Sequence, residues 1–170
     1  MDMFNREDIF NNKLYPAYTN IVRGIENRSI YAPIRNKLER LRKLIAKAYE
    51  EVHRLSIYHP TSDIETIYGM IGRINNLAEE IEDLIDEILA EKMLPGRDSE
   101  TFKQYLRRIK YEVIMNIEND AAALLFDIEH GDEYGVDYYQ FEDELIKFID
   151  GTERALSEVG SSIREILRYT

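Results

Sequence analysis

Aliphatic residues recur at alternating intervals of three and four along this chain, and no other feature constrains its fold as strongly. Residues with this spacing fall on one side of an α-helix, and such rows pack against neighbouring helices at about +20°. The three clearest rows are Ile34, Leu38, Leu41, Ile45, Ala48, Val52 and Leu55; Ile64, Ile67, Ile71, Ile74, Ala78, Ile81, Ile85 and Ile88; and Phe141, Leu145, Phe148, Thr152, Leu156, Val159, Ile163 and Ile166.

Cap and turn residues divide the chain into five predicted helices joined by short loops. Ser62 with Glu65 has the spacing of a capping box, Asp137 starts the last helix, and Gly131 ends the one before it. Long helices of matching length with short joints favour antiparallel packing. We therefore predict an all-α fold, a single domain over residues 1–170, built as an up-and-down antiparallel bundle of about five long amphipathic helices. The expected helices span residues 5–27, 33–58, 62–94, 99–130 and 137–170.

Composition excludes several classes of protein. The chain has no cysteine and only three histidines, so disulfides, thiolate metal sites and cysteine nucleophiles are excluded. It contains neither a glycine-rich phosphate loop nor a G-x-S-x-G elbow. No run approaches the ~18 apolar residues of a membrane span, and the first residues do not read as a secretory signal. We expect a cytoplasmic protein with no membrane partner, no cofactor and no catalytic residues.

The charge pattern supports two interpretations. The net charge is −11, and an acidic surface repels phosphate backbones unless one face is locally basic. Such a face is predicted at one end of the bundle, where the second and fourth helices begin. Its cations are Arg35, Lys37, Arg40, Arg42, Lys43, Arg107, Arg108 and Lys110. Those residues would bind a phosphate backbone, or they would pair with the acidic half of the third helix, Glu79 to Glu91, at the same end.

Three short patterns have the spacing of catalytic or metal-binding helices. Paired Glu/Asp-x-x-His motifs are typical of metal sites inside bundles. The Arg-x4-His spacing occurs in helical ribonuclease domains, and Glu-x-x-Asp occurs in helical nucleotide pyrophosphatases. They leave a metal-dependent hydrolase as an alternative function. The patterns are Glu50-x-x-His53 with Asp127-x-x-His130, Arg54-x4-His59, and the acids from Glu79 to Asp83.

Four stretches together resemble one known family. The basic stretch of residues 37–54 ends in Val52-His53-Arg54, and Asn119-Asp120-Ala121, Gly135-Val136-Asp137-Tyr138 and residues 148–154 follow. Over residues 25–90 and 100–156 the chain is similar to the translin and translin-associated factor X family. The resemblance implies an all-helical protein that assembles into hollow oligomers and binds or cleaves single-stranded RNA or DNA.

One departure from that family affects the expected activity. Ile117 stands where the catalytic members carry the first glutamate of an acid pair, which leaves Asp120 and Asp150 as weak metal candidates. Metal-dependent phosphodiester cleavage needs a carboxylate cluster around the cation. We therefore predict a non-enzymatic bundle that forms a homo-oligomer and binds single-stranded RNA or DNA. A purely structural assembly or adaptor protein is the alternative from another class.

Overall fold

The computed structural model describes residues 34–92, 97–134 and 138–168. Over these ranges the chain is helical and contains no strand, so the predicted all-α class is confirmed. The first predicted helix, residues 5–27, lies outside the described residues. The described elements are α3 (Arg35–Tyr58), η3 (His59–Thr61), α4 (Ile64–Leu89), α5 (Arg97–Arg108), η4 (Ile109–Ile114), α6 (Met115–Tyr134) and α7 (Tyr138–Arg168).

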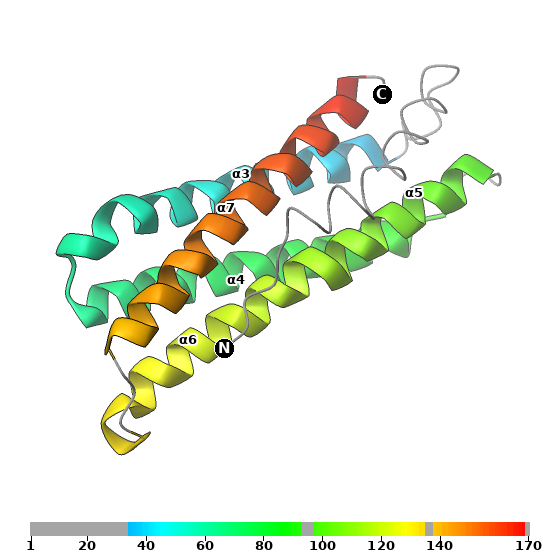
Figure 1. The fold of residues 1–170 in the computed structure, drawn as a ribbon. Helices are drawn as coiled ribbons and strands as arrows, with labels where there is room; N and C mark the ends of the chain where they lie inside the picture. The colour runs from blue at the N-terminus through cyan, green and yellow to red at the C-terminus, as the bar shows by residue number, and fades with distance from the viewer. Residues whose placement is uncertain (1–33, 93–96, 135–137, 169–170) are drawn as a thin grey trace.

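Helix α3 packs against two neighbours, α4 on one side and α7 on the other, and α4 in turn packs against α6. Elements α5, η4 and α6 follow one another as one long rod (Figure 1). The chain reverses direction between α3 and α4, between α4 and this rod, and between the rod and α7 (Figure 1). Each helix therefore lies antiparallel to the next one in the sequence.

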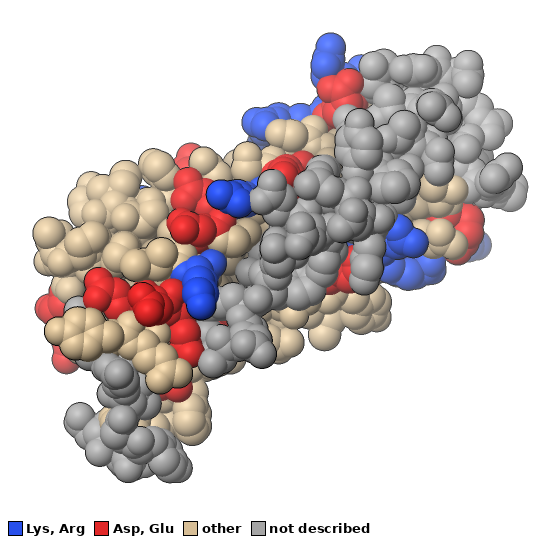
Figure 2. All heavy atoms as spheres, viewed as in Figure 1, with Lys and Arg blue, Asp and Glu red and all other residues tan. Residues whose placement is uncertain are grey.

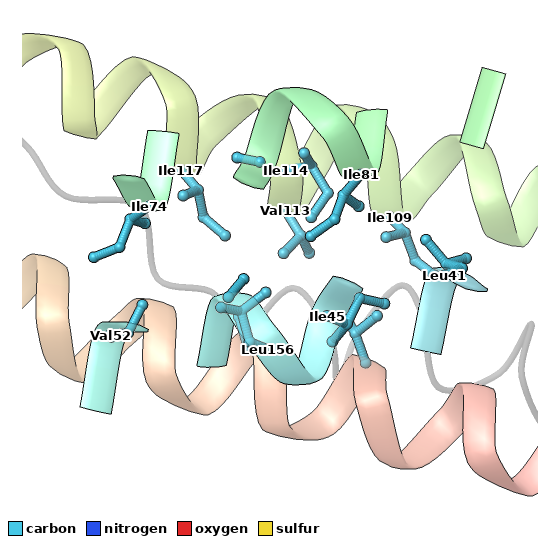
Figure 3. Close-up of a cluster of buried hydrophobic side chains, with 14 of the residues drawn as sticks. Leu41, Ile45, Val52, Ile74, Ile81, Ile109, Val113, Ile114, Ile117 and Leu156 are labelled. Carbon is cyan, nitrogen blue, oxygen red and sulfur yellow. The ribbon is translucent and has the colours of Figure 1, made fainter. Parts of the chain in front are cut away.

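The predicted rows supply much of the core, and α5, η4 and α6 add further buried residues such as Phe102 and Ile109. Every member of the first and third rows is buried, and so is every member of the second row except Ile64, which is 45% exposed beside the α3–α4 turn. Figure 3 shows Ile45, Ile81 and Leu156 from three helices among the η4 and α6 side chains. At Gly160 of α7, an added Cβ would lie 3.4 Å from Ile45 Cγ2, so a larger residue there would press on α3.

Several predicted helix ends are wrong in detail. The cap of α4 is Asp63, whose carboxylate accepts from the Thr66 N–H at 2.8 Å, while the Ser62 hydroxyl donates to the Tyr58 carbonyl. Helix α4 ends at Leu89, before the predicted residue 94. Gly131 does not end its helix, which continues to Tyr134, because glycine weakens a helix without forcing it to stop. The predicted cap Asp137 lies outside the described residues.

The segment η4 is a π-helix in the middle of the long rod. The buried residues Ile109, Val113, Ile117 and Ala121 follow one another at intervals of four, which is longer than the 3.6 residues of an α-turn. A wider π-turn absorbs the excess and keeps all four on the core side. The Asn116 amide donates to the Glu112 carbonyl at 3.1 Å and to the Tyr111 carbonyl at 3.4 Å, which satisfies backbone groups in the widened turn.

Candidate functional site: the groove between helices α3 and α4

Two of the predicted nucleic-acid-binding residues are paired with the acidic helix α4. Lys37 Nζ lies 3.3 Å from Glu87 Oε1 and also contacts the Glu91 carboxylate, and its hydrogen bond to Glu91 raises the pKa of Lys37. Lys110 Nζ lies 2.5 Å from Asp86 Oδ1, and that hydrogen bond raises the pKa of Lys110. The predicted pairing between basic and acidic helices is confirmed at these two positions.

Three further predicted cations have partners outside α4, two on their own helix and one on α7. Arg42 Nε donates to Glu39 Oε1 at 2.9 Å, and this bond lowers the pKa of Glu39. Arg107 Nη1 lies 3.4 Å from Glu100 Oε1. Arg35 Nη1 donates to the carbonyl of Leu167, near the end of α7, at 3.1 Å. Arg108 is exposed on α5.

The remaining predicted cations, Arg40 and Lys43, line a groove of about 450 Å³ between α3 and α4. We call its α3 wall the basic row and its α4 wall the acidic row. Leu44 and Leu84 complete its lining, and both belong to the packed interior or its margin. The basic row is Arg40, Lys43 and Lys47, and the acidic row is Glu80, Asp83 and Glu87.

Most of these charges remain unpaired across the α3–α4 groove. All six side chains of the two rows are exposed. Over the described ranges, Glu87 is the one member of either row within ion-pairing distance of an opposite charge, and its partner is Lys37 outside the basic row. The groove thus presents two charged rows of opposite sign on either side of apolar residues.

On the face shown in Figure 2, acidic and basic groups lie among one another over the described surface. No extended surface of positive charge is visible in the described part of that face. The predicted phosphate-binding surface would also combine α3 with α5. In the structure, Arg107 of α5 and Lys110 of η4 are held by carboxylates, whereas the basic row has no carboxylate within ion-pairing distance among the described residues.

A second groove lies between α3 and α7, in two adjoining parts of about 330 and 450 Å³ that share Tyr49 and Ser157. Glu153 Oε1 accepts from the Tyr49 hydroxyl at 3.4 Å and lies 3.2 Å from His53 Nδ1. The groove also carries Arg42 and Arg154, so both signs of charge occur along it. This polar contact joins α3 to α7.

The weak metal candidates do not form a centre. Asp150 is exposed beside the α3–α7 groove, whereas Asp120 is 7% exposed within α6. Glu50 and His53 are both exposed on α3, so this pair does not face the interior where a bundle metal site would lie. Among the residues that the structure describes, no three histidines or carboxylates are gathered as metal ligands.

One functional group that the sequence reasoning missed lies between α4 and α6. Glu118 is partly buried there, and its pKa is raised to about 8 by burial, by the facing Glu82, and by the charges of Glu79 and Asp83. Its Oε1 is buried without a hydrogen-bond partner. In sequence, Glu118 resembles any helical glutamate. The one indication of burial in the sequence was its position next to the apolar residue Ile117, on a helix expected to lie beside the acidic half of the third predicted helix.

No family model, curated protein or solved structure matches this chain. The similarity to the translin and translin-associated factor X family therefore remains a sequence-based prediction. Within the described ranges, no helix combines the length and the apolar composition that crossing a membrane requires.

Proposed function

We propose that this protein is a non-enzymatic assembly protein that associates with copies of itself through the α3–α4 groove. The observation that carries the proposal is the pair of oppositely charged rows, which face each other across Leu44 and Leu84 without closing into ion pairs. Each row offers charge to a second molecule.

Because the groove carries both positive and negative charge, it favours a protein partner over a polyanion. A polyanion in the groove would meet the basic row but would also meet the acidic row, where like charges repel. A protein surface that carries both signs avoids that conflict. A second copy of this chain presents such a surface, because it carries the same two rows.

Individual ion pairs at this surface contribute little. An exposed pair stabilises by about 0–1 kcal/mol, so several pairs must act together. Their attraction is screened over ~10 Å at 0.1 M salt and over ~3 Å at 1 M. We therefore expect a salt-sensitive association.

Sedimentation velocity over a concentration series tests this proposal. In about 0.1 M salt, where screening extends over ~10 Å, wild-type protein should form dimers that dissociate at high salt. Lys43→Glu should abolish or strongly weaken them. Lys147→Glu, which makes the same charge change at an exposed site on α7, should leave them intact. A wild-type monomer at every concentration, or equal effects of the two variants, would contradict the proposal.

A second candidate function is binding of single-stranded RNA or DNA by the basic row, as the translin-like resemblance implies. Its support is that Arg40, Lys43 and Lys47 are exposed and have no carboxylate within ion-pairing distance in the described part of the chain. Fluorescence anisotropy with a labelled single strand tests it. Lys47→Ala should weaken binding equally for all sequences and reduce the salt slope by ~1. Absence of binding at low salt would reject it.

We further propose that residues 5–27 form the remaining helix of an up-and-down bundle of about five. The sequence pattern of that segment supports this architecture. Hydrogen exchange read by mass spectrometry on the full chain should show protected amides in residues 5–27, and free exchange there would contradict it.

A further inference from the structure

We infer that the two copies in this assembly are related by a two-fold axis running parallel to α3 and α4, so that α3 of each copy lies on α4 of the other. This inference rests on the proposed self-association. It specifies which residues of the partner subunit contact the groove.

The direction of the axis follows from the placement of the rows on different helices. Two copies of one face can meet about a two-fold axis that runs along the helices or across them. An axis along the helices exchanges the sides of the groove, so each α3 faces α4 of the other copy and opposite charges meet. An axis across the helices keeps the sides, so each basic row faces the other basic row. Like-charge contacts of that kind are unfavourable.

The register follows from two contacts within one chain. Lys37 contacts both Glu87 and Glu91, so its level lies about midway between them, near Leu89 at the end of α4. Counted from there along the two antiparallel helices, Lys43 lies at the level of Asp83, and Lys47 lies within one residue of the level of Glu80. An axis parallel to the helices preserves these levels. Lys43 then meets Asp83 of the partner subunit, and Lys47 meets Glu80 of the partner subunit.

A second copy supplies ion-pair partners for the two charged rows of the groove. Within one chain, the two rows stand on opposite walls of the groove, and the described basic-row cations have no ion pair. In the inferred pair, each row is covered by the row of opposite sign. Leu44 and Leu84 would lie near the centre, where shielding from water strengthens the surrounding ion pairs. Both copies make the same contacts, so the assembly closes at two.

Cysteine cross-linking tests the axis directly, because the natural chain contains no cysteine. Lys43→Cys and Asp83→Cys chains are prepared separately, mixed and oxidised, because a disulfide forms only between residues whose Cα atoms lie within about 7 Å. The mixture should give a cross-linked pair containing one chain of each kind, and neither variant alone should. Lys147→Cys on α7 is the matched control and should not cross-link with Asp83→Cys.

The outcomes separate the inference from the proposed function. Wild-type dimers by sedimentation combined with self-cross-linking of Lys43→Cys would overturn the parallel axis and leave self-association standing. Dimers without any cross-link at residues 43 and 83 would also overturn the inference, because the groove would lie outside the contact. A monomeric wild type would reject the proposed function itself.

Discussion

Helix α4 takes part in two interhelical contacts of opposite electrostatic character. Towards α3, its carboxylates meet cations, as in the contact of Glu87 with Lys37. Towards α6, Glu82 meets another carboxyl group, Glu118, while Lys110 is bound to Asp86. One acidic helix thus forms ion pairs towards α3, and towards the rod of η4 and α6 it combines an ion pair with an acid–acid contact.

This comparison shows that the surroundings of each acidic side chain, rather than the number of acids along the sequence, decide whether that side chain is ionised. An exposed carboxylate beside a cation remains ionised and attracts a partner. A partly buried carboxyl that faces another acid retains its proton to a higher pH, because both desolvation and like charge disfavour ionisation. The α3–α4 side is therefore suited to binding, and the α4–α6 side makes the fold sensitive to pH.

The largest effect is expected in the core that both contacts share. Ile81 on α4 is fully buried, and Ile81→Ala should lower the free energy of unfolding by about 2–5 kcal/mol. Its exposed neighbour is the matched control, and Glu80→Ala should change monomer stability by no more than about 0.5 kcal/mol. Urea denaturation of dilute protein measures both. Similar losses in the two variants would show that the helix is packed differently.

Replacing the acid between α4 and α6 should produce the next largest effect. With a folded pKa of about 8 against an ordinary 4.5, Glu118 stabilises fully below pH 4.5, and this contribution is lost as pH rises to about 8. Glu118→Gln should gain about 1 kcal/mol at pH 8, less than the whole shift implies because water screens a partly exposed group. The variant should also show a flatter dependence of stability on pH.

Thermal unfolding at several pH values measures this difference. Glu50→Gln, an exposed change on α3, is the control and should leave the pH profile unaltered. If Glu118→Gln destabilises the protein at pH 8, the acid–acid contact is not unfavourable and the comparison between the two sides of α4 fails.

Removing the cation beside the acidic contact should have a smaller effect. Lys110 lies against Asp86, and Glu82 also contributes to the rise in the Lys110 pKa. Lys110→Met should cost no more than about 1 kcal/mol near neutral pH. It should also move the pH-dependent loss of stability to higher pH, because the acids lose a favourable neighbour. An unchanged midpoint would mean that Lys110 does not influence the Glu82–Glu118 contact.

The smallest effect is expected at the ion pair on the other side of α4. Lys37 contacts Glu87 and Glu91 at a solvated surface, so Lys37→Ala should lower Tm only slightly, and the difference should vanish in 1 M salt. Differential scanning calorimetry at two salt concentrations measures this change. A difference that persists in high salt would indicate lost packing of the lysine stem instead of lost charge.

Much of the fold could be predicted because helix periodicity depends on local sequence. Ile45, Ile81 and Leu156 fall on apolar rows, and burial of those rows is the dominant gain on folding. The π-segment was not predicted, since its signal is only three successive intervals of four from Ile109. The cap of α4 was assigned one residue early, because Ser62 and Asp63 are both good caps and their backbone conformations decide between them.

The sequence alone determined that the chain is helical, that its aliphatic rows turn inward, and that most of its charged residues remain at the surface. Only the tertiary structure decided which charged side chains form ion pairs and which line the groove without one. Lys37 and Lys43 belong to the same basic stretch, yet one is bound to α4 and the other lines the α3–α4 groove. Electrostatic energies depend on distance and local dielectric, and both are set by how neighbouring helices pack.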